Sequence, residues 1–464
     1  MEGLEVSVLS KKDIDLGNRI DAEYFQQCNL LIEQRLKELP HKTLGEIATF
    51  VASAFYPAAT QLYAIGDTPF IRCVDCINYP LITKGQDESF EKIPINFILD
   101  NSGVNTLNKG DIVITKVGSP CYASIVYEHD TVALSRTVMG IKNISTVIPL
   151  YLLAFLRCKY GFQELYRERE QTIQFQLTLE RVRNIPIYIA SSLLQDAIAD
   201  VYHRYYVNIH NADQIYEQAE NILLNELCFN KTSMTPDICS YKRFSDFVNS
   251  GRLDAEYYQP KYDNLFTQLN KFETKRLGDI VQIRKSIEPG SEAYQNQGIP
   301  FMRVANLSKF GFSDTDIHLL PDEYGDIIRP KQNTILLSKD GSVGIAYKVE
   351  QDMEVITSGA ILHLTITDNE FLPDYLTLVL NSIIVGMQAE RDAGGSIIQH
   401  WKPSEIENVI IPKLRQEIQQ EITNKVQESF ALRKESHRLL NLAKTAVETA
   451  IEQGEATAIK LLDI

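Results

Sequence analysis

The sequence contains little that would support a metal centre or a disulfide framework. Its 464 residues include only seven cysteines, an odd number without regular spacing, and none follows Cys239. Only Cys73 and Cys76 have the spacing of zinc ligands, and no second pair of Cys or His residues is placed to complete a four-ligand site. We therefore expect no metal site and no full set of disulfides, and we interpret this pair as incidental to a neighbouring strand.

Long apolar runs and targeting signals are also absent. No stretch of eighteen apolar residues occurs, which argues against a membrane span. Residues 1–17 lack the basic-then-apolar pattern of a secretion signal. These absences predict a cytoplasmic protein without a membrane partner.

Positive charge is scarce. The chain has 46 Lys and Arg against 61 Asp and Glu, so its formal net charge is −15. Residues 41–148 carry eight basic against ten acidic side chains, and residues 275–370 carry ten against fourteen. A protein that coats nucleic acid by general attraction usually has a basic surface, so this class is disfavoured. Binding through a few local cationic patches remains compatible with the composition.

Recognisable catalytic motifs are missing. The sequence has no GxxxxGK[ST] phosphate loop, no GxGxxG after a strand and no NPPY or DPPY tetrapeptide. The glycines of "RDAGGS" at residues 391–396 lack a strand-to-helix context. Asp21 with Glu23, and Asp254 with Glu256, stand at i and i+2, which does not place them on one helix face. We therefore predict no catalytic residue and no cofactor, and a stand-alone nuclease would need carboxylate ligands that cannot be assigned.

The strongest positive feature is an internal repeat. "RIDAEYF" at Arg19 returns as "RLDAEYY" at Arg252, and "LGEI" returns as "LGDI" at the same offset of 233. Further pairs follow at offsets of 231, 223 and 224: "TPFIRC" with "IPFMRV", "IVITKVGSP" with "ILLSKDGSV", and "TIQFQL" with "SIIQHW". Two units of about 230 residues thus fill the chain. Residues 79–107 and 307–330 share almost nothing, a combination that favours one scaffold carrying two different recognition surfaces.

The pattern within each unit predicts an α+β fold. Short β-branched runs such as "DIVITKV" and "TILLSK", separated by Gly, Pro, Asn and Asp, indicate a strand-rich module. Helical spacing follows each "DAEY" phrase, and "PLYLLAFLRCKYGFQELYRE" and "PDYLTLVLNSIIVGMQAE" each predict a helix opened by proline. The pseudo-two-fold arrangement of two such tandem units is our prediction for the architecture.

Each unit closes with a long helical segment free of proline and glycine, from Ser191 and from Lys413. A helix this long usually needs a packing partner, so we expect the two to pair as an antiparallel coiled coil, although a solvated single helix remains the alternative. Expected interface positions are Val201, Tyr205, Asn208, Ile215, Ile222, Ile418, Ile422, Val426, Leu439 and Ala446. At 1.5 Å per residue, about 38 residues span about 57 Å, more than one turn of B-DNA.

These signals predict six segments. They are an N-terminal arm and short helix (1–40), a first recognition domain (41–190), a first spacer helix (191–235), a linker with the repeated phrase (236–274), a second recognition domain (275–411) and a second spacer helix (412–464).

The duplicated "DAEYY" phrase, the "KxGS" loops and the closing helices, in this order, resemble the DNA-specificity subunit of type I restriction–modification enzymes over nearly the full length. The resemblance implies two target-recognition domains, each reading half of a split site in double-stranded DNA. It also implies helices that set the spacing and dock methyltransferase subunits, and a motor–nuclease subunit joined through the complex. The subunit itself would catalyse nothing, and a weakly cationic chain would need its partners for further phosphate contacts.

Candidate DNA-contacting residues should be basic or amide side chains on loops of the modules. Lys116, Gly118 and Ser119 in "TKVGSP" recur as Lys339, Gly341 and Ser342 in "SKDGSV"; a plain turn with a solvated lysine is the alternative. Gln174, Gln176, Gln399 and Lys402 stand on a second corresponding loop, where capping or core roles compete with adenine contacts.

Three arginines complete the candidate set. Arg72 and Arg303 recur after "PF", and an ion pair is the favoured interpretation because shared residues suit shared scaffold. Arg136 has no basic counterpart in the second unit and would suit base discrimination. The competing function, which the acidic charge favours slightly, is a coiled-coil scaffold whose paired modules bind protein.

Overall fold

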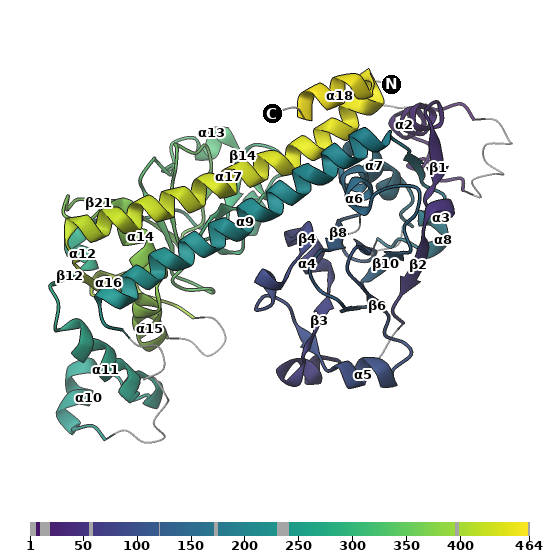
Figure 1. Cartoon of the computed structure of the whole chain (residues 1–464). Helices are drawn as coiled ribbons and strands as arrows, with labels where there is room; N and C mark the ends of the chain where they lie inside the picture. The colour runs from purple at the N-terminus through teal and green to yellow at the C-terminus, as the bar shows by residue number, and fades with distance from the viewer. Residues whose placement is uncertain are drawn as a thin grey trace. The chain divides into compact units, whose positions relative to one another are not determined.

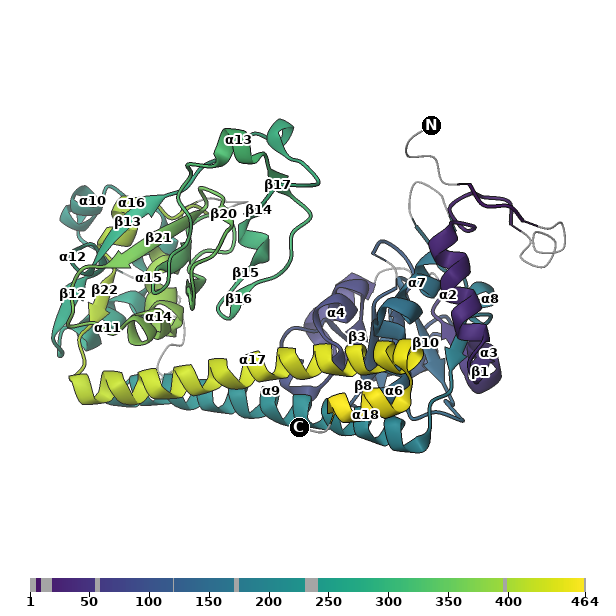
Figure 2. The same ribbon diagram turned by 90° about the horizontal axis from the view of Figure 1, so that it is seen from above.

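The computed structural model describes residues 6–9, 19–54, 59–119, 121–170, 175–229, 241–394 and 399–462. The chain divides into two compact units: unit 1 contains residues 1–210 and 433–464, and unit 2 contains residues 211–432 (Figures 1 and 2). Both borders fall inside long helices, α9 (Ser192–Glu226) and α17 (Gln416–Gln453). The compact units therefore do not coincide with the sequence repeats, because each unit includes part of both helices.

Unit 1 is built on two sheets and a two-stranded ribbon. The larger sheet has the order β2-β10-β7-β8-β4 and the smaller β5-β3-β9-β6, while β1 pairs with β11. The strand bounds are β1 His41–Thr43, β2 Thr49–Ala52, β3 Thr68–Ile71, β4 Leu81–Ile82, β5 Lys92–Ile93, β6 Thr106–Leu107, β7 Ile112–Thr115, β8 Ala123–Val126, β9 Val132–Leu134, β10 Val138–Lys142 and β11 Pro186–Tyr188. The expected β-branched runs form β7 and β8, and every residue of both strands is buried.

Helices surround these sheets. Their bounds are α2 Gln27–Lys37, α3 Leu44–Ile47, η1 Ala59–Ile65, α4 Cys73–Asn78, η2 Lys84–Gln86, α5 Ile95–Asp100, α6 Pro149–Arg157, α7 Lys159–Arg167, α8 Leu179–Val182 and α18 Glu455–Leu462. The main core joins α6 and α7 to β7, β8 and β10.

Unit 2 repeats much of this plan. Its sheets have the orders β13-β21-β18-β19 and β17-β14-β20, and two ribbons pair β12 with β22 and β15 with β16. The strands are β12 Thr274–Arg276, β13 Val281–Lys285, β14 Ile299–Met302, β15 Leu307–Ser308, β16 Gly311–Phe312, β17 His318–Leu319, β18 Ile335–Ser338, β19 Ala346–Lys348, β20 Ile356–Thr357, β21 Ile361–Ile366 and β22 Ile410–Pro412. The helices are α10 Phe244–Ser250, η4 Ala255–Tyr258, α11 Pro260–Leu269, α12 Leu277–Ile280, η5 Ser291–Ala293, η6 Val304–Asn306, α13 Pro321–Tyr324, α14 Pro373–Asn381, α15 Ile383–Asp392 and α16 Pro403–Glu407.

Equivalent pairings occur at equivalent positions in the two units. The parallel pair β3–β9 corresponds to β14–β20, and the ribbon β1–β11 corresponds to β12–β22. The hydroxyl of Tyr151 donates to the carbonyl of Tyr188 at 2.7 Å, and that of Tyr375 donates to the carbonyl of Pro412 at 2.7 Å. The repeated sequence thus produces repeated local structure.

The expected single helix after each proline is two helices. α6 and α7 are separated at Cys158 (ψ 167°), and α14 and α15 at Ser382 (ψ 160°). The prediction was wrong at both breaks. In unit 1 the turn is tight at Gly161, where a Cβ would lie 2.1 Å from the carbonyl oxygen of Phe155, but the corresponding residue of unit 2 is Val385, so the break does not depend on glycine. Apolar periodicity continues across such a break, so it gives no warning of one.

The long helices pack against one another within each unit (Figures 1 and 2). In unit 2 the hydroxyl of Ser429 donates to the carbonyl of Ala212 at 2.7 Å, and Lys425 donates to Gln218 at 2.8 Å. The residue numbers of the paired side chains increase along α9 while those of their partners decrease along α17, so the local pairing is antiparallel. In unit 1, Ile198 of α9 shares a core with Ala443 of α17.

The packed stripe differs by one step from the expected one. Five expected interface residues are buried, namely Val201, Ile422, Val426, Leu439 and Ala446. Five others are only partly buried, namely Tyr205, Asn208, Ile215, Ile222 and Ile418. The buried positions include the large residues Tyr216 and Leu223, one step after Ile215 and Ile222, as well as small residues such as Ala212 and Ser429, which allow the helix backbones to approach closely.

Both long helices are shorter than their predicted segments. α9 ends at Glu226, whereas the predicted segment continued to residue 235. Residues 230–240 lie outside the described ranges. α17 begins at Gln416, after β22, and ends before Gly454, whose φ of 93° stops the helix. The prediction of one helix over residues 412–464 was therefore wrong at its end, where α18 follows as a separate helix.

A buried carboxyl distinguishes the scaffold of unit 1. Glu164 on α7 corresponds to Gln388 on α15, whose side chain accepts from the N–H of Ile410 at 2.8 Å and donates to its carbonyl at 3.0 Å. The residue corresponding to Ile410 is Pro186, which has no N–H to donate. Burial raises the pKa of Glu164 to about 8, so this carboxyl is mostly protonated near neutral pH.

The Glu164→Gln variant should make unit 1 less sensitive to alkaline pH. The pKa in the folded chain lies above the ordinary 4.5, so wild-type stability is lost as pH rises from 4.5 through about 8. We expect melting temperatures of the two proteins to be similar at pH 5 and the variant to melt higher at pH 9. The exposed Glu88→Gln serves as control, and equal melting shifts at both pH values would contradict the prediction.

Among the described residues, no helix combines the length and the apolarity of a membrane span.

Candidate nucleic-acid interface

The repeated "DAEY" phrase forms an anchor for the module and not a pair of free carboxylates. Arg19 donates to both oxygens of Asp21 at 2.6 and 2.9 Å, and Arg252 donates to both oxygens of Asp254 at 2.6 Å. Arg19 also donates to the carbonyl of Arg169 at 3.0 Å. The hydrogen bond from Arg252 lowers the pKa of Asp254, which keeps this carboxylate charged and paired. The phrase ties the chain to the end of the second helix of its module.

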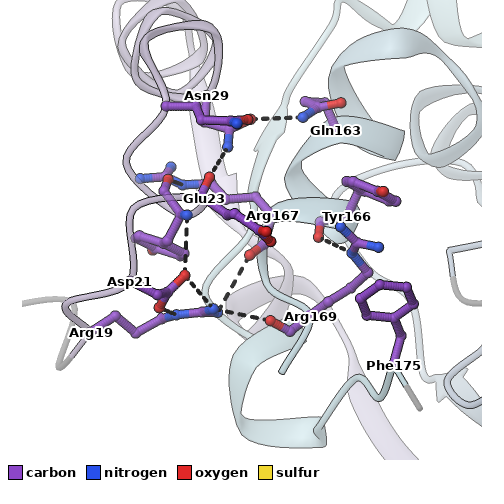
Figure 3. A pocket seen from close by; sticks show the side chains of 11 residues that line it. Arg19, Asp21, Glu23, Asn29, Gln163, Tyr166, Arg167, Arg169 and Phe175 are labelled. Carbon is purple, nitrogen blue, oxygen red and sulfur yellow. Dashed lines mark hydrogen bonds and ion pairs between the residues drawn. The ribbon is translucent and has the colours of Figure 1, made fainter. Parts of the chain in front are cut away.

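A pocket of about 290 Å³ lies beside this anchor in unit 1 (Figure 3). The guanidinium of Arg169 stands 3.0 Å from the centre of the Tyr166 ring and 4.2 Å from that of Phe175. The corresponding residues of unit 2 are Glu390, Ala393 and Gln399, which cannot form this stack. The residue pattern does not predict this stack; its only signal in the sequence is a basic residue flanked by aromatic ones in the first unit alone.

The first predicted loop follows β7 and has a defined backbone. The hydroxyl of Thr115 donates to the carbonyl of Ser119 at 2.7 Å and accepts from the N–H of Tyr122 at 3.0 Å. Gly118 has φ 89°, and a Cβ there would meet no atom of a described residue within 4 Å. Gly118 and Ser119 are exposed, so the loop presents its tip to solvent.

The corresponding loop of unit 2 has the same frame. The hydroxyl of Ser338 donates to the carbonyl of Ser342 at 2.6 Å and accepts from the N–H of Ile345 at 2.9 Å. Gly341 has φ 74°, and a Cβ there would likewise contact nothing within 4 Å in the described part of the chain. Glycine is favoured at both positions because other residues rarely adopt this conformation.

In both units a second segment lies against this loop. The N–H of Leu177 donates to the carbonyl of Lys116, and that of Trp401 to the carbonyl of Lys339, each at 2.8 Å. Gln176 is exposed beside Val117. Gln399 is exposed, and its carbonyl accepts from Gly341 at 2.9 Å. The tertiary structure thus joins the two predicted loops, while Gln174 lies outside the described residues.

The two loop lysines differ in their electrostatic surroundings. Lys116 is half-buried, forms no ion pair with any described residue, and has its pKa lowered by burial. Lys339 forms an ion pair with Asp340, which also contacts His400 at 2.9 Å. Although burial raises the pKa of Asp340, the hydrogen bonds from Lys339 and His400 hold it below its ordinary range. Lys116 therefore offers an uncompensated charge and Lys339 a neutralised one.

The remaining basic candidates divide in the same way. Arg72 forms ion pairs with Glu91 at 3.3 Å and Asp75 at 3.5 Å. An ion pair was the interpretation that the sequence favoured for this residue. The counterpart Arg303 is exposed, and its guanidinium has no ion pair within the described part of the chain. Arg136 is exposed between β9 and β10, and Lys402 pairs with Glu405 at 3.3 Å.

The Cys73–Cys76 pair lies on α4, directly after β3. Burial raises the pKa of both thiols, so neither is held as a thiolate. Across the described ranges, no three His, Cys, Asp or Glu side chains gather as a metal site requires.

Comparison with known families matches residues 270–439 to the type I restriction modification DNA specificity domain. The chain is similar to the solved S subunit of a type-I restriction-modification system from M. genitalium, with 11% identity, a TM-score of 0.37, and coverage of 91% of this chain and 95% of that one. It is also similar to the HsdS subunit from Thermoanaerobacter tengcongensis, with 14% identity, a TM-score of 0.29, and coverage of 89% and 97%. Comparison with curated proteins finds no match.

Removing the Ser338 hydroxyl should destabilise unit 2. Ser338→Ala leaves the N–H of Ile345 and the carbonyl of Ser342 without their partner, which should lower the free energy of unfolding by about 1–3 kcal/mol. The control Ser342→Ala removes an exposed hydroxyl but keeps the accepting carbonyl, so its effect should stay within about 0.5 kcal/mol. Urea unfolding of both variants tests this, and equal midpoints would contradict it.

Proposed function

Because residues 270–439 belong to the type I restriction modification DNA specificity domain family, we propose that this chain is the DNA-recognition subunit of a multisubunit restriction–modification enzyme and has no catalytic centre of its own. The observation that carries this proposal is the pair of loops at Lys116 and Lys339. They share their backbone hydrogen bonds but differ in the charges around them. A shared frame with different side chains is suited to reading two different sequences.

Each unit reads one half of a split, asymmetric site in double-stranded DNA. The recognition domains cover residues 41–190 and 275–411. The two differ in the stack at Arg169, in the pairing of their loop lysines and in the surroundings of Arg72 and Arg303. A palindromic target would require like surfaces, and the surfaces are unlike.

The long helices set the distance between the half-sites. We infer that α9 and α17 form one antiparallel coiled coil and that the two repeats are related by a pseudo-two-fold axis. The antiparallel contact of Ser429 with Ala212 and the shared core of Ile198 with Ala443 support this. A 38-residue helix is about 57 Å long. Its exposed polar faces would dock methyltransferase subunits, and the motor–nuclease subunit would join through them.

The proposed DNA contacts come from the loops and their neighbours. The full set is Arg72, Lys116, Gly118, Ser119, Arg136, Gln174, Gln176, Arg303, Lys339, Gly341, Ser342, Gln399 and Lys402. Lys116 and Arg303 rank first among the cations, because neither has an ion pair with a described residue. Lys339, Lys402 and Arg72 rank lower, since carboxylates already compensate them. A net charge of −15 implies that partner subunits supply further phosphate contacts.

A selection from randomised DNA should reveal the predicted target. Co-expression with the methyltransferase subunits, followed by sequencing of the methylated or bound DNA, should yield two unlike half-sites separated by a fixed spacer. Exchanging residues 41–190 for another such module should change one half-site only. A palindrome, a continuous motif or failure to co-purify with a methyltransferase would favour the protein-binding scaffold instead.

Substitution of the loop lysines should have unequal effects. Lys116→Met should weaken DNA binding and reduce the salt dependence by about one phosphate contact, because its charge is uncompensated. Lys339→Met should have a smaller effect, and Asp340→Asn should strengthen binding by releasing Lys339. Exposed Lys109, before the opposite end of β7, provides the matched control Lys109→Met. Equal losses for Lys116→Met and Lys109→Met, measured by fluorescence anisotropy at several salt concentrations, would exclude this role.

A further inference from the structure

One sheet of unit 2 has two chemically different faces. Side chains alternate along β13 and β21, so Leu362 and Leu364 enter the core while Gln282, Arg284 and His363 face the other way. These polar side chains form one side of a pocket of about 750 Å³. The segment 328–334 and the start of α14 complete its walls.

The pocket is rich in hydrogen-bond donors, and none of the described residues that line it carries a carboxylate. Arg329 donates to the carbonyl of Ile327 at 2.6 Å, and Lys331 pairs with Asp352 at 3.0 Å. The guanidinium of the exposed Arg284 has no ion pair or hydrogen bond with any described residue. A chain with excess negative charge thus keeps one uncompensated guanidinium at the pocket, which suits an anionic ligand group.

The floor of the pocket contains an unpartnered polar atom. His363 is 1% exposed, and its Nε2 lies 2.8 Å from the hydroxyl of Thr357. Its Nδ1 has no hydrogen-bond partner within the described residues. Burial lowers the pKa of His363 to about 4, so the ring is neutral near pH 7. Buried polar atoms are normally satisfied, so this unpartnered nitrogen on a residue that lines the pocket is a candidate partner for a ligand group.

The scaffold does not require these polar groups, because unit 1 lacks them. The row Arg284–His363 corresponds by strand pairing to Val51–Gly140. There Leu107 fills the space: a Cβ on Gly140 would lie 2.4 Å from the Leu107 side chain and 3.0 Å from that of Val51. The same sheet position is closed and apolar in unit 1 but open and polar in unit 2.

We propose that the pocket of unit 2 binds a nucleotide. The phosphate lies at the guanidinium of Arg284, a pairing that the charge of both groups favours. The base packs on the partly buried apolar lining residues Ile328, Ile366 and Leu372, with its polar edge facing Gln282, Asn333 and His363. The nucleotide is either a free mononucleotide or one nucleotide of a DNA strand. This site stands apart from the half-site reading proposed above.

Isothermal titration of the full chain with AMP, GMP, CMP and UMP, and with adenosine and inorganic phosphate, tests the site. At least one mononucleotide should bind with Kd below about 1 mM and more tightly than adenosine or phosphate alone. Arg284→Ala should weaken binding at least about tenfold, whereas Lys285→Ala, which removes the adjacent exposed charge from outside the pocket, should change it less than about twofold. Both positions are exposed, so both variants should keep the wild-type melting temperature.

A competition experiment identifies the source of the nucleotide. If a single-stranded oligodeoxynucleotide displaces the mononucleotide, the pocket takes a nucleotide of DNA; if it does not, the ligand is a free nucleotide. Both results support the site. Absence of binding by every mononucleotide and the oligonucleotide, or equal affinities of wild type and Arg284→Ala, would overturn it. Such a failure would leave the two-half-site selection unaffected, so the two proposals are tested separately.

Discussion

Burial of the apolar stripes of two long helices is the constraint on which the rest of the structure depends. Helices of 35 and 38 residues would each leave an apolar stripe in water if they stood alone. Each compact unit therefore combines a part of α9 with a part of α17. Small residues such as Ala212 and Ser429 bring the backbones close enough for a side chain to donate to a main-chain carbonyl. Neither module completes its core without residues from both repeats.

Both modules keep the same local backbone conformation but carry different side chains on it. Thr115 and Ser338 hold equivalent loops with equivalent hydrogen bonds. The same sheet position is Gly140 in one unit and His363 in the other, and this exchange replaces an apolar contact with a polar pocket. The residues that hold these loops in place are thus not the ones proposed to contact a ligand. The residues proposed to contact a ligand can therefore differ between the units.

Much of the local structure could be predicted from periodicity and from residues with restricted backbones. The β-branched runs became β7 and β18, and Gly118 and Gly341 mark turns with positive φ. The predictions that were wrong concern helix continuity. The break at Cys158 was missed because apolar spacing continues through it and only close helix packing requires it. The packed helix stripe was displaced by one step because Tyr216 and Leu223 compete with Ile215 and Ile222 for the buried face, and only the contacts of the folded chain decide between them.

The sequence by itself determined the duplication, the order of the elements and the position of the lysine loops, because these follow from the residue types along the chain. Only the tertiary structure decided which charges are available. Lys339 is neutralised and Lys116 is not, although both stand in the same motif. Arg284 and His363 form a pocket floor because strands distant in sequence become neighbours. An ion pair or a hydrogen bond needs atoms within about 4 Å, and only folding sets that separation.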